Sequence, residues 1–296
     1  MKQRTRLMSH VSRPKTGVLS GLTIGIIGTG TMGQALLRGL LAQGVPRRAL
    51  RVADANPRTR RLVSRRFRLP VAADGGAVAR GSDLVILAVK PQQFPDVVAL
   101  LARHLTRPAT TRGGGASRPL VVTIAAGVTL RWLQSRLPGV PLVRVMPNLP
   151  ATVGCGFSAV AAGREASRRH RALVRALFGA VGTVVELPER QLDAVTAVSG
   201  SGPAYVFYLA HIWEEAARAL GLPRAVASEA VRRTLEGSVR LLAESGEPAA
   251  ALIAKVASKG GTTEAALKVL ASRRVPASFA QALRAAARRS QALSHK

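Results

Sequence analysis

The residues best suited to chemistry lie in two glycine-rich segments, one near the start of the chain and one in its last third. In the first, Gly28, Gly30 and Gly33 form the pattern Gly-x-Gly-x-x-Gly, directly after an apolar run and at the start of a helical pattern. In such a unit the first glycine allows a tight turn, the second lets the backbone approach a pyrophosphate, and the third lets helix and strand pack closely. The N–H groups of the helix N-terminus then bind the phosphates. The motif predicts a dinucleotide site; the alternative is a glycine turn that binds no ligand.

Polar side chains after the next apolar run bear on which dinucleotide would bind. Asp54 lies about 20 residues beyond the glycines, where a carboxylate accepts hydrogen bonds from the adenosine ribose, and this favours NADH. Asn56 and the nearby Arg58, Arg60 and Arg61 could instead hold a 2′-phosphate, which favours NADPH. Those arginines equally fit a solvated helix face. The sequence therefore predicts NADPH or NADH and leaves the choice open.

Three later apolar runs also end in residues that suit a ligand site. Lys90 follows one run directly, and residues 124–127 and 146–148 end the next two. In open α/β sheets, ligands bind beyond the carboxyl ends of the strands. Small residues there would let a flat cofactor ring approach closely, although ordinary tight turns have the same composition.

The second glycine-rich segment, Ser258-Lys-Gly-Gly-Thr-Thr263, precedes a helical pattern, and a similar serine- and glycine-rich motif at residues 197–205 precedes another. Exposed N–H groups at a helix N-terminus, beside threonine hydroxyls, form a site for a carboxylate. The alternative is simple capping of the helices by serine or threonine. Because two such motifs share one domain, we favour the binding site.

Other common chemistries are missing from the sequence. The five histidines have no metal-ligand spacing, and the one cysteine, Cys155, has no activating neighbour in sequence. A single cysteine also excludes an intramolecular disulfide. We therefore expect no metal and no cysteine nucleophile.

The elements that must position these residues change character along the chain. Residues 21–187 alternate short apolar runs with helical patterns, as in a parallel sheet covered by helices on both faces. Residues 188–296 show helical patterns only, with enough apolar positions to indicate a partner subunit. The sequence predicts an α/β fold, a Rossmann-like doubly wound sheet followed by an all-α domain for substrate binding and dimerisation. Predicted strands cover 22–27, 50–53, 84–89, 120–124, 142–146, 157–161 and 183–187, and predicted helices cover 34–43, 57–67, 204–220, 224–244, 249–256, 262–271 and 276–293.

Composition bears on partners and location. Lys and Arg outnumber Asp and Glu by 44 to 15, so the net charge is +29 and would favour anionic partners. The arginines are scattered and aromatic residues make up only 3%, so we attribute the charge to composition and expect no nucleic-acid partner. The basic segment 1–20 is expected to be a disordered tail, with an organelle presequence as the alternative, and residues 112–117 a flexible surface loop. No segment is apolar enough to span a membrane, and we expect a cytoplasmic protein.

Six motifs, in order, give the chain a family resemblance. Gly28-Thr-Gly-Thr-Met-Gly33, Ala88-Val-Lys-Pro91, Ile124-Ala-Ala-Gly127, Met146-Pro-Asn148, Val198-Ser-Gly-Ser-Gly-Pro-Ala-Tyr205 and Gly260-Gly-Thr-Thr263 resemble motifs of the pyrroline-5-carboxylate reductases, and the resemblance covers residues 22–293. It implies reduction of 1-pyrroline-5-carboxylate to L-proline by NAD(P)H, the last step of proline biosynthesis, by a homodimer or a ring of dimers. Together with the motif analysis it predicts cofactor contacts at Gly28, Thr29, Gly30, Thr31, Met32, Gly33, Asp54, Asn56, Ala88, Val89, Lys90, Pro91, Ala125, Ala126 and Asn148.

The same resemblance implies where the substrate binds. The predicted substrate contacts are Lys90, Val256, Ser258, Gly260, Gly261, Thr262 and Thr263, and the catalytic candidates are Thr262 and Thr263. The N–H groups around Gly261 and Thr262 would hold the carboxylate, and the Thr263 hydroxyl would hydrogen-bond the imine nitrogen, which brings the imine carbon over the nicotinamide.

Two alternatives stay open at this point. A relative of the 3-hydroxyacid dehydrogenases would share the two-domain plan. It would need a catalytic lysine in the first long helix of the second domain, and residues 204–222 contain no lysine. A non-catalytic protein that binds NAD(P) or nucleic acid would explain two departures from the family pattern, a missing Lys-Asp pair in residues 252–259 and Lys259 in place of a proline.

Overall fold

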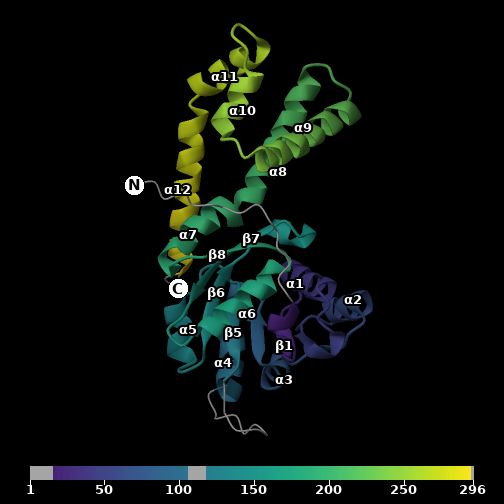
Figure 1. Ribbon diagram of the computed structural model, residues 1–296, viewed down its shortest axis with the longest axis vertical. Helices are drawn as coiled ribbons and strands as arrows, with labels where there is room; N and C mark the ends of the chain where they lie inside the picture. The colour runs from purple at the N-terminus through teal and green to yellow at the C-terminus, as the bar shows by residue number, and fades with distance from the viewer. Residues whose placement is uncertain (1–15, 106–117, 295–296) are drawn as a thin grey trace. The chain divides into compact units, whose positions relative to one another are not determined.

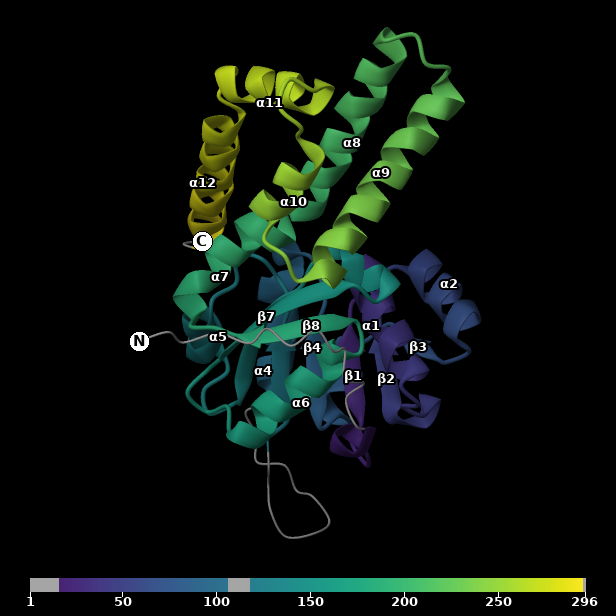
Figure 2. The ribbon, with the colours of Figure 1, turned by 45° about the horizontal axis from the view of Figure 1, so that its top comes forward.

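The structure is a computed structural model that describes residues 16–105 and 118–294 (Figures 1 and 2). It comprises two compact units, a sheet unit that ends at Gly200 and resumes at Ala287, and a helical unit, Ser201–Ala286. The loop expected at 112–117 and most of the tail expected at 1–20 lie outside the described residues. The last part of that tail, Thr16–Leu19, is a 3-10 helix rather than disordered chain, because Leu19 packs into the core of the sheet unit.

The described residues of the sheet unit form one eight-stranded sheet in the order β3-β2-β1-β4-β5-β6-β7-β8. All neighbours are parallel except β6 and β7, which are antiparallel. The sequence patterns predict parallel strands throughout, and β7 departs from this because residues 147–155 are too few for the helical crossover that a parallel pair needs. The strands are β1 (Ile24–Ile27), β2 (Leu50–Ala53), β3 (Val71–Ala72), β4 (Leu84–Leu87), β5 (Leu120–Thr123), β6 (Leu142–Met146), β7 (Gly156–Ala162) and β8 (Gly182–Glu186).

Helices cover both faces of this sheet because successive side chains of a strand point to opposite sides. Ile24 and Ile26 belong to a buried cluster with residues of α1, α2 and α6, whereas Ile27 belongs to a second cluster with residues of α3, α4 and α5. This confirms the predicted doubly wound fold. The helices of the sheet unit are α1 (Thr31–Ala42), α2 (Pro57–Phe67), α3 (Gly75–Arg80), α4 (Phe94–Leu105), α5 (Leu130–Arg136), α6 (Arg168–Gly179) and α7 (Leu192–Val195).

One ion pair of the sheet unit is largely buried. The Arg144 guanidinium on β6, whose side chain is 4% exposed, donates to Glu189 Oε1 over 3.1 Å. The same carboxylate oxygen accepts the N–H of Leu130 at the start of α5, over 2.8 Å. Glu189 therefore links a central strand to a helix terminus while it balances the buried charge.

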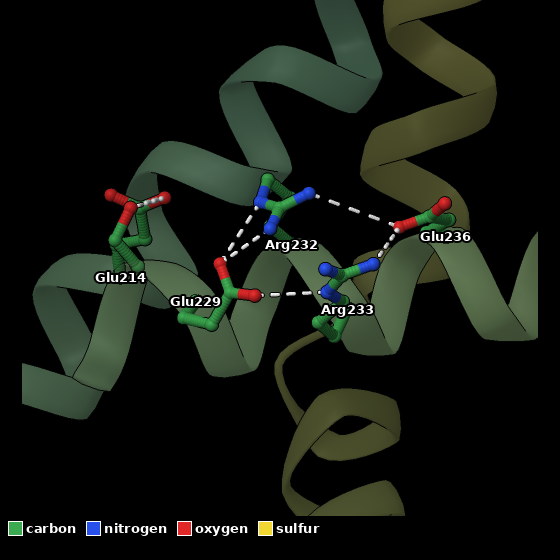
Figure 3. Close-up of polar contacts among 6 residues, drawn as sticks. Glu214, Glu229, Arg232, Arg233 and Glu236 are labelled. Atoms are coloured by element: carbon green, nitrogen blue, oxygen red, sulfur yellow. Dashed lines mark hydrogen bonds and ion pairs between the residues drawn. The ribbon is translucent and has the colours of Figure 1, made fainter. Parts of the chain in front are cut away.

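The helical unit contains the predicted run of helices, α8 (Gly202–Ala219), α9 (Arg224–Ser245), α10 (Ala249–Val256), α11 (Thr262–Ser272) and most of α12 (Val275–Ser294). Along α9, Glu229 accepts hydrogen bonds from Arg232 and Arg233, and Glu236 accepts from Arg233 (Figure 3). The two guanidinium groups lower the pKa of Glu229. These pairs are one helical turn apart and exposed, so water screens their attraction and each adds little to the stability of the helix. Among the described residues, no helix is both long and apolar enough to cross a membrane.

The far end of α12 belongs to the sheet unit again. Ser290, which is 4% exposed, donates a hydrogen bond of 2.7 Å to Asp193 Oδ1 on α7. Leu293 lies against the Gly127 turn so closely that a Cβ added to this glycine would be 3.0 Å from the Leu293 backbone oxygen. The sheet unit is thus built from two segments of the chain, with the helical unit between them in sequence.

Candidate functional site

The strand order reverses its direction between β1 and β4, because β1 leads to β2 and β3 on one side and β4 leads to β5 and β6 on the other. Open α/β sheets bind ligands at such a reversal, beyond the carboxyl ends of the strands. A cavity of about 840 Å³ lies at this point. Its lining residues are Ile27, Gly28, Gly30, Ala53, Asp54, Ala55, Asn56, Pro57, Thr59, Ala73, Gly75, Ala88, Val89, Lys90, Gln93, Asp96, Val97 and Leu100.

The three glycines of the first motif each meet a different physical demand at this cavity. Gly28 has a φ of 95°, and a Cβ added to it would lie 2.7 Å from the carbonyl carbon of Ala88, so only glycine fits the turn. A Cβ at Gly33 would collide with the carbonyl oxygen of Gly28, so glycine is also needed for the close packing of α1 on the loop. Gly30 faces open space and is the N-cap of α1 without a side chain that could bond the first amides. Those amides are left available to an anion, and the site fits a dinucleotide pyrophosphate.

The Asp54 carboxylate holds two loops of the site together. Its Oδ2 accepts hydrogen bonds from the backbone N–H and the hydroxyl of Thr29, over 2.8 and 2.7 Å. Its Oδ1 accepts the N–H of Asn56 over 2.8 Å. The Asn56 side chain in turn caps α2 by accepting the N–H groups of Arg58 and Thr59. Backbone N–H groups and one hydroxyl therefore fix the loops after β1 and β2.

The structure places the predicted cofactor contacts in three groups. Seven of them line the cavity: Gly28, Gly30, Asp54, Asn56, Ala88, Val89 and Lys90. Thr29, Thr31, Met32, Gly33 and Pro91 lie in the same loops and first helical turns. Ala125, Ala126 and Asn148 follow β5 and β6 and are not among the lining residues.

Asn148 has a structural task within the sheet unit. Its Oδ1 accepts the N–H of Phe157 at the start of β7 over 2.8 Å, and its Nδ2 donates to the Ser199 hydroxyl over 3.0 Å. One N–H of the side-chain amide stays available for a ligand.

One wall of the cavity has no counterpart in the motif analysis. Gln93, Asp96, Val97 and Leu100 line it from α4 and the turn before it. Their spacing of i, i+3, i+4 and i+7 is that of one helix face. This spacing is visible in the sequence, but nothing local indicates that the face borders a ligand site.

The second glycine-rich segment starts α11 in the helical unit. Gly261 is the N-cap and donates its N–H to the Ser258 carbonyl over 3.0 Å, while Gly260 donates to the Glu264 carboxylate. The hydrogen bond from Gly260, and then the one from Lys268, lower the pKa of Glu264. The Gly261 N–H, expected to serve a ligand, is therefore already used. The first-turn amides that lack an intrahelical acceptor are those of Thr262, Thr263 and Glu264, since the helix bonds begin with Ala265.

Simple capping does not explain the serines and threonines of these motifs. The Ser201 side chain, at the N-cap of α8, makes no bond to the first amides of its helix, and the N-cap of α11 is Gly261, which has no side chain. Of the predicted substrate contacts at this terminus, Ser258, Gly260 and Thr262 are exposed, and Gly261 and Thr263 are half-buried. Lys90 belongs to the sheet unit, and Val256 ends α10. Among the described residues, no group of three His, Cys, Asp or Glu side chains is placed to hold a metal ion.

Comparison with known proteins agrees with this geometry. Residues 189–293 match the family model for pyrroline-5-carboxylate reductase dimerisation, and residues 23–109 match the model for coenzyme F420-dependent NADP oxidoreductase. A pyrroline-5-carboxylate reductase from Synechocystis sp. is 40% identical over 277 residues, which are 93% of this chain and 99% of that protein.

Solved structures give the same result. The pyrroline-5-carboxylate reductase of Coxiella burnetii superposes with a TM-score of 0.82 at 32% identity, over 92% of this chain and 98% of that one. The pyrroline carboxylate reductase of Plasmodium falciparum with NADP bound has a TM-score of 0.80 at 26% identity, over 93% and 98%. The chain has a cavity that fits a dinucleotide at the sheet reversal and a helical unit with a glycine-threonine helix terminus. It belongs to the pyrroline-5-carboxylate reductase family.

Proposed function

We propose that this protein reduces 1-pyrroline-5-carboxylate to L-proline with NAD(P)H, the last step of proline biosynthesis. The observation that carries the proposal is the 40% identity to a pyrroline-5-carboxylate reductase over 93% of the chain. The built dinucleotide cavity supports it, because the glycine loop and the amides of α1 fit a pyrophosphate. The 3-hydroxyacid dehydrogenase alternative has no such support.

The chain's task at the cofactor is to bind and to orient. A bound reduced nicotinamide supplies the hydride for the imine carbon. The first-turn amides of Thr31, Met32 and Gly33 would hold the pyrophosphate, and Asp54 with Asn56 the adenosine ribose. We propose that Ala125, Ala126, Asn148 and residues 88–91 border the nicotinamide half, because they follow β4, β5 and β6 at the carboxyl edge of the sheet.

The substrate is a cyclic imine with a carboxylate, and the chain must hold both groups. We place the carboxylate at the free amides of Thr262 and Thr263, with Ser258, Gly260, Gly261, Val256 and Lys90 as the surrounding contacts. The Thr263 hydroxyl would hydrogen-bond the ring nitrogen, and solvent water would deliver its proton. Such placement lowers the barrier mainly through orientation.

We also propose a homodimer formed through the helical unit. Large apolar side chains of α8 are 41–66% exposed in the single chain, and a soluble monomer rarely leaves such a surface uncovered. These side chains are Val206, Phe207, Tyr208, Leu209, Ile212 and Trp213. We also propose a cytoplasmic location, because a chain with one cysteine cannot use intramolecular disulfides, as is usual for proteins of the reducing cytosol.

One assay tests the activity. Purified protein is mixed with 1-pyrroline-5-carboxylate, and the oxidation of NADH and of NADPH is followed by absorbance. We expect substrate-dependent oxidation and formation of proline. A folded sample that binds a cofactor and turns over with neither would overturn the proposed reaction.

A further inference from the structure

The adenosine-ribose end of the cavity carries an inference about which cofactor the enzyme selects, and this inference rests on the proposed function. NADPH differs from NADH only by a phosphate on the 2′-oxygen of that ribose. The phosphate has a charge of about −1.5 to −2 at neutral pH, so a pocket for it needs a cation nearby. A pocket for the free hydroxyl needs an acceptor instead.

Asp54 supplies that acceptor in a fixed position. It directly follows β2, and it lines the cavity beside Ala55 and Asn56. A carboxylate can accept about four hydrogen bonds, and Thr29 and Asn56 together fill three of these places. One place stays open on a carboxylate that lines the cavity, which suits a single ribose hydroxyl.

Cations are missing from this end of the cavity. Of the described residues that line it, two are acidic, Asp54 and Asp96, and Lys90 is the one base. Lys90 follows β4, whereas the ribose end is formed after β2. A phosphate at the ribose would therefore lie against the Asp54 carboxylate without a cationic side chain from the cavity lining.

The arginines of α2 do not supply the missing charge. Arg60 Nη1 donates to the backbone oxygens of Asp54 and Ala55, over 3.0 and 2.8 Å, so this guanidinium is bonded to the loop backbone, and Arg60 is not among the lining residues. Arg58 and Arg61 are exposed and are not among the lining residues. The position directly after Asp54, from which a side chain could meet a phosphate, is Ala55.

We infer that this pocket selects NADH over NADPH and that Asp54 is the specificity-determining residue. The carboxylate accepts the 2′-hydroxyl of NADH and repels the 2′-phosphate of NADPH. Its three hydrogen bonds keep it in place, so it cannot turn away from the phosphate without breaking the link between the loops after β1 and β2.

Equilibrium binding tests this without turnover. The dissociation constants of NADH and NADPH are measured from the fluorescence of the reduced nicotinamide, in the absence of substrate. We expect the wild-type protein to bind NADH at least about tenfold more tightly, since charge repulsion at this range is worth about one decade or more. Asp54→Asn should move the ratio of the two constants toward one, and Ala55→Arg, which leaves the carboxylate network intact, should tighten NADPH alone.

A matched control removes a different carboxylate. Asp83 accepts the N–H of Thr23 over 2.7 Å and precedes β4, at the opposite edge of the parallel strands from Asp54. Asp83→Asn should leave both constants unchanged. NADPH binding as tight as NADH binding in the wild type, or a ratio that neither Asp54→Asn nor Ala55→Arg changes in folded protein, would overturn the inference. Selective NADH binding without turnover of 1-pyrroline-5-carboxylate would overturn the proposed function and leave the inference standing.

Discussion

Glu189→Gln should destabilise the sheet unit strongly, although it only replaces one carboxylate oxygen by an amide nitrogen and removes one charge. Glutamine keeps an oxygen that can accept from Leu130 and Arg144, so the hydrogen bonds survive and the countercharge is lost. Breaking a buried ion pair costs about 3–5 kcal/mol. Because the Glu189 side chain is 30% exposed and water already screens part of the attraction, we expect a loss below this range or at its lower limit, about 2–3 kcal/mol.

Thermal unfolding followed by circular dichroism measures this loss. A domain of this size loses roughly 2–4 °C in Tm per kcal/mol, so the variant should melt about 4–12 °C lower. Glu186→Gln is the matched control, since its partner Arg175 lies 2.8 Å away but is 60% exposed, and such a surface pair contributes about 0–1 kcal/mol. Combining Glu189→Gln with Arg144→Met removes both charges and should recover most of the lost stability. Equal, small shifts for Glu189→Gln and Glu186→Gln would refute the reasoning.

Four further predictions follow from single sites. Thr263→Ala should lower kcat/KM about 5- to 150-fold through the lost hydrogen bond to the substrate. Tm and cofactor affinity should stay unchanged, because no side chain caps the start of α11. A lowered Tm with wild-type kinetics would show that Thr263 has a structural role only. Gly33→Ala should weaken the binding of both dinucleotides, measured by nicotinamide fluorescence, because a Cβ there collides with the Gly28 carbonyl. Burial, and then the charge of Arg169, lower the pKa of His170 below 6.5. The contribution of the neutral imidazole to stability is therefore complete above pH 6.5 and is lost as the pH falls through the pKa of the folded state. In His170→Gln, Tm should fall less steeply than in the wild type as the pH is lowered. Phe207→Asp places a charge on the exposed face of α8 and should give a monomeric mass by light scattering.

Elements with local signals could be predicted from the sequence, and others could not. The helix α2 begins at the predicted residue because Asn56 caps it and Pro57 fits its first position. The two-residue strand β3 has no alternation to detect, and α3 begins with two glycines that disfavour a helix, so both escape a pattern search. The capping carboxylate of Asp74 and the buried positions of Gly75 and Gly76 stabilise α3 in the folded protein.

The candidate site divides in the same way. The glycine loop and Asp54 are contiguous or regularly spaced in sequence, and Gly28, Gly30 and Asp54 do line the cavity. Two other features depend on the folded backbone. They are the position of α4 at the wall of the cavity and the hydrogen bond from the Gly261 N–H to the Ser258 carbonyl. Residue types alone do not reveal which amide is already bonded.

The two-segment construction of the sheet unit has a consequence for the order of folding during synthesis. Domains generally fold as they emerge from the ribosome, from the N-terminus onward. The contacts of Ser290 with Asp193 and of Leu293 with Gly127 can form only after all five helices of the helical unit have been made. During synthesis, the α7 surface and the turn after β5 therefore stay uncovered until the end of the chain is made. The sheet unit can be completed only after the helices of the helical unit have been translated.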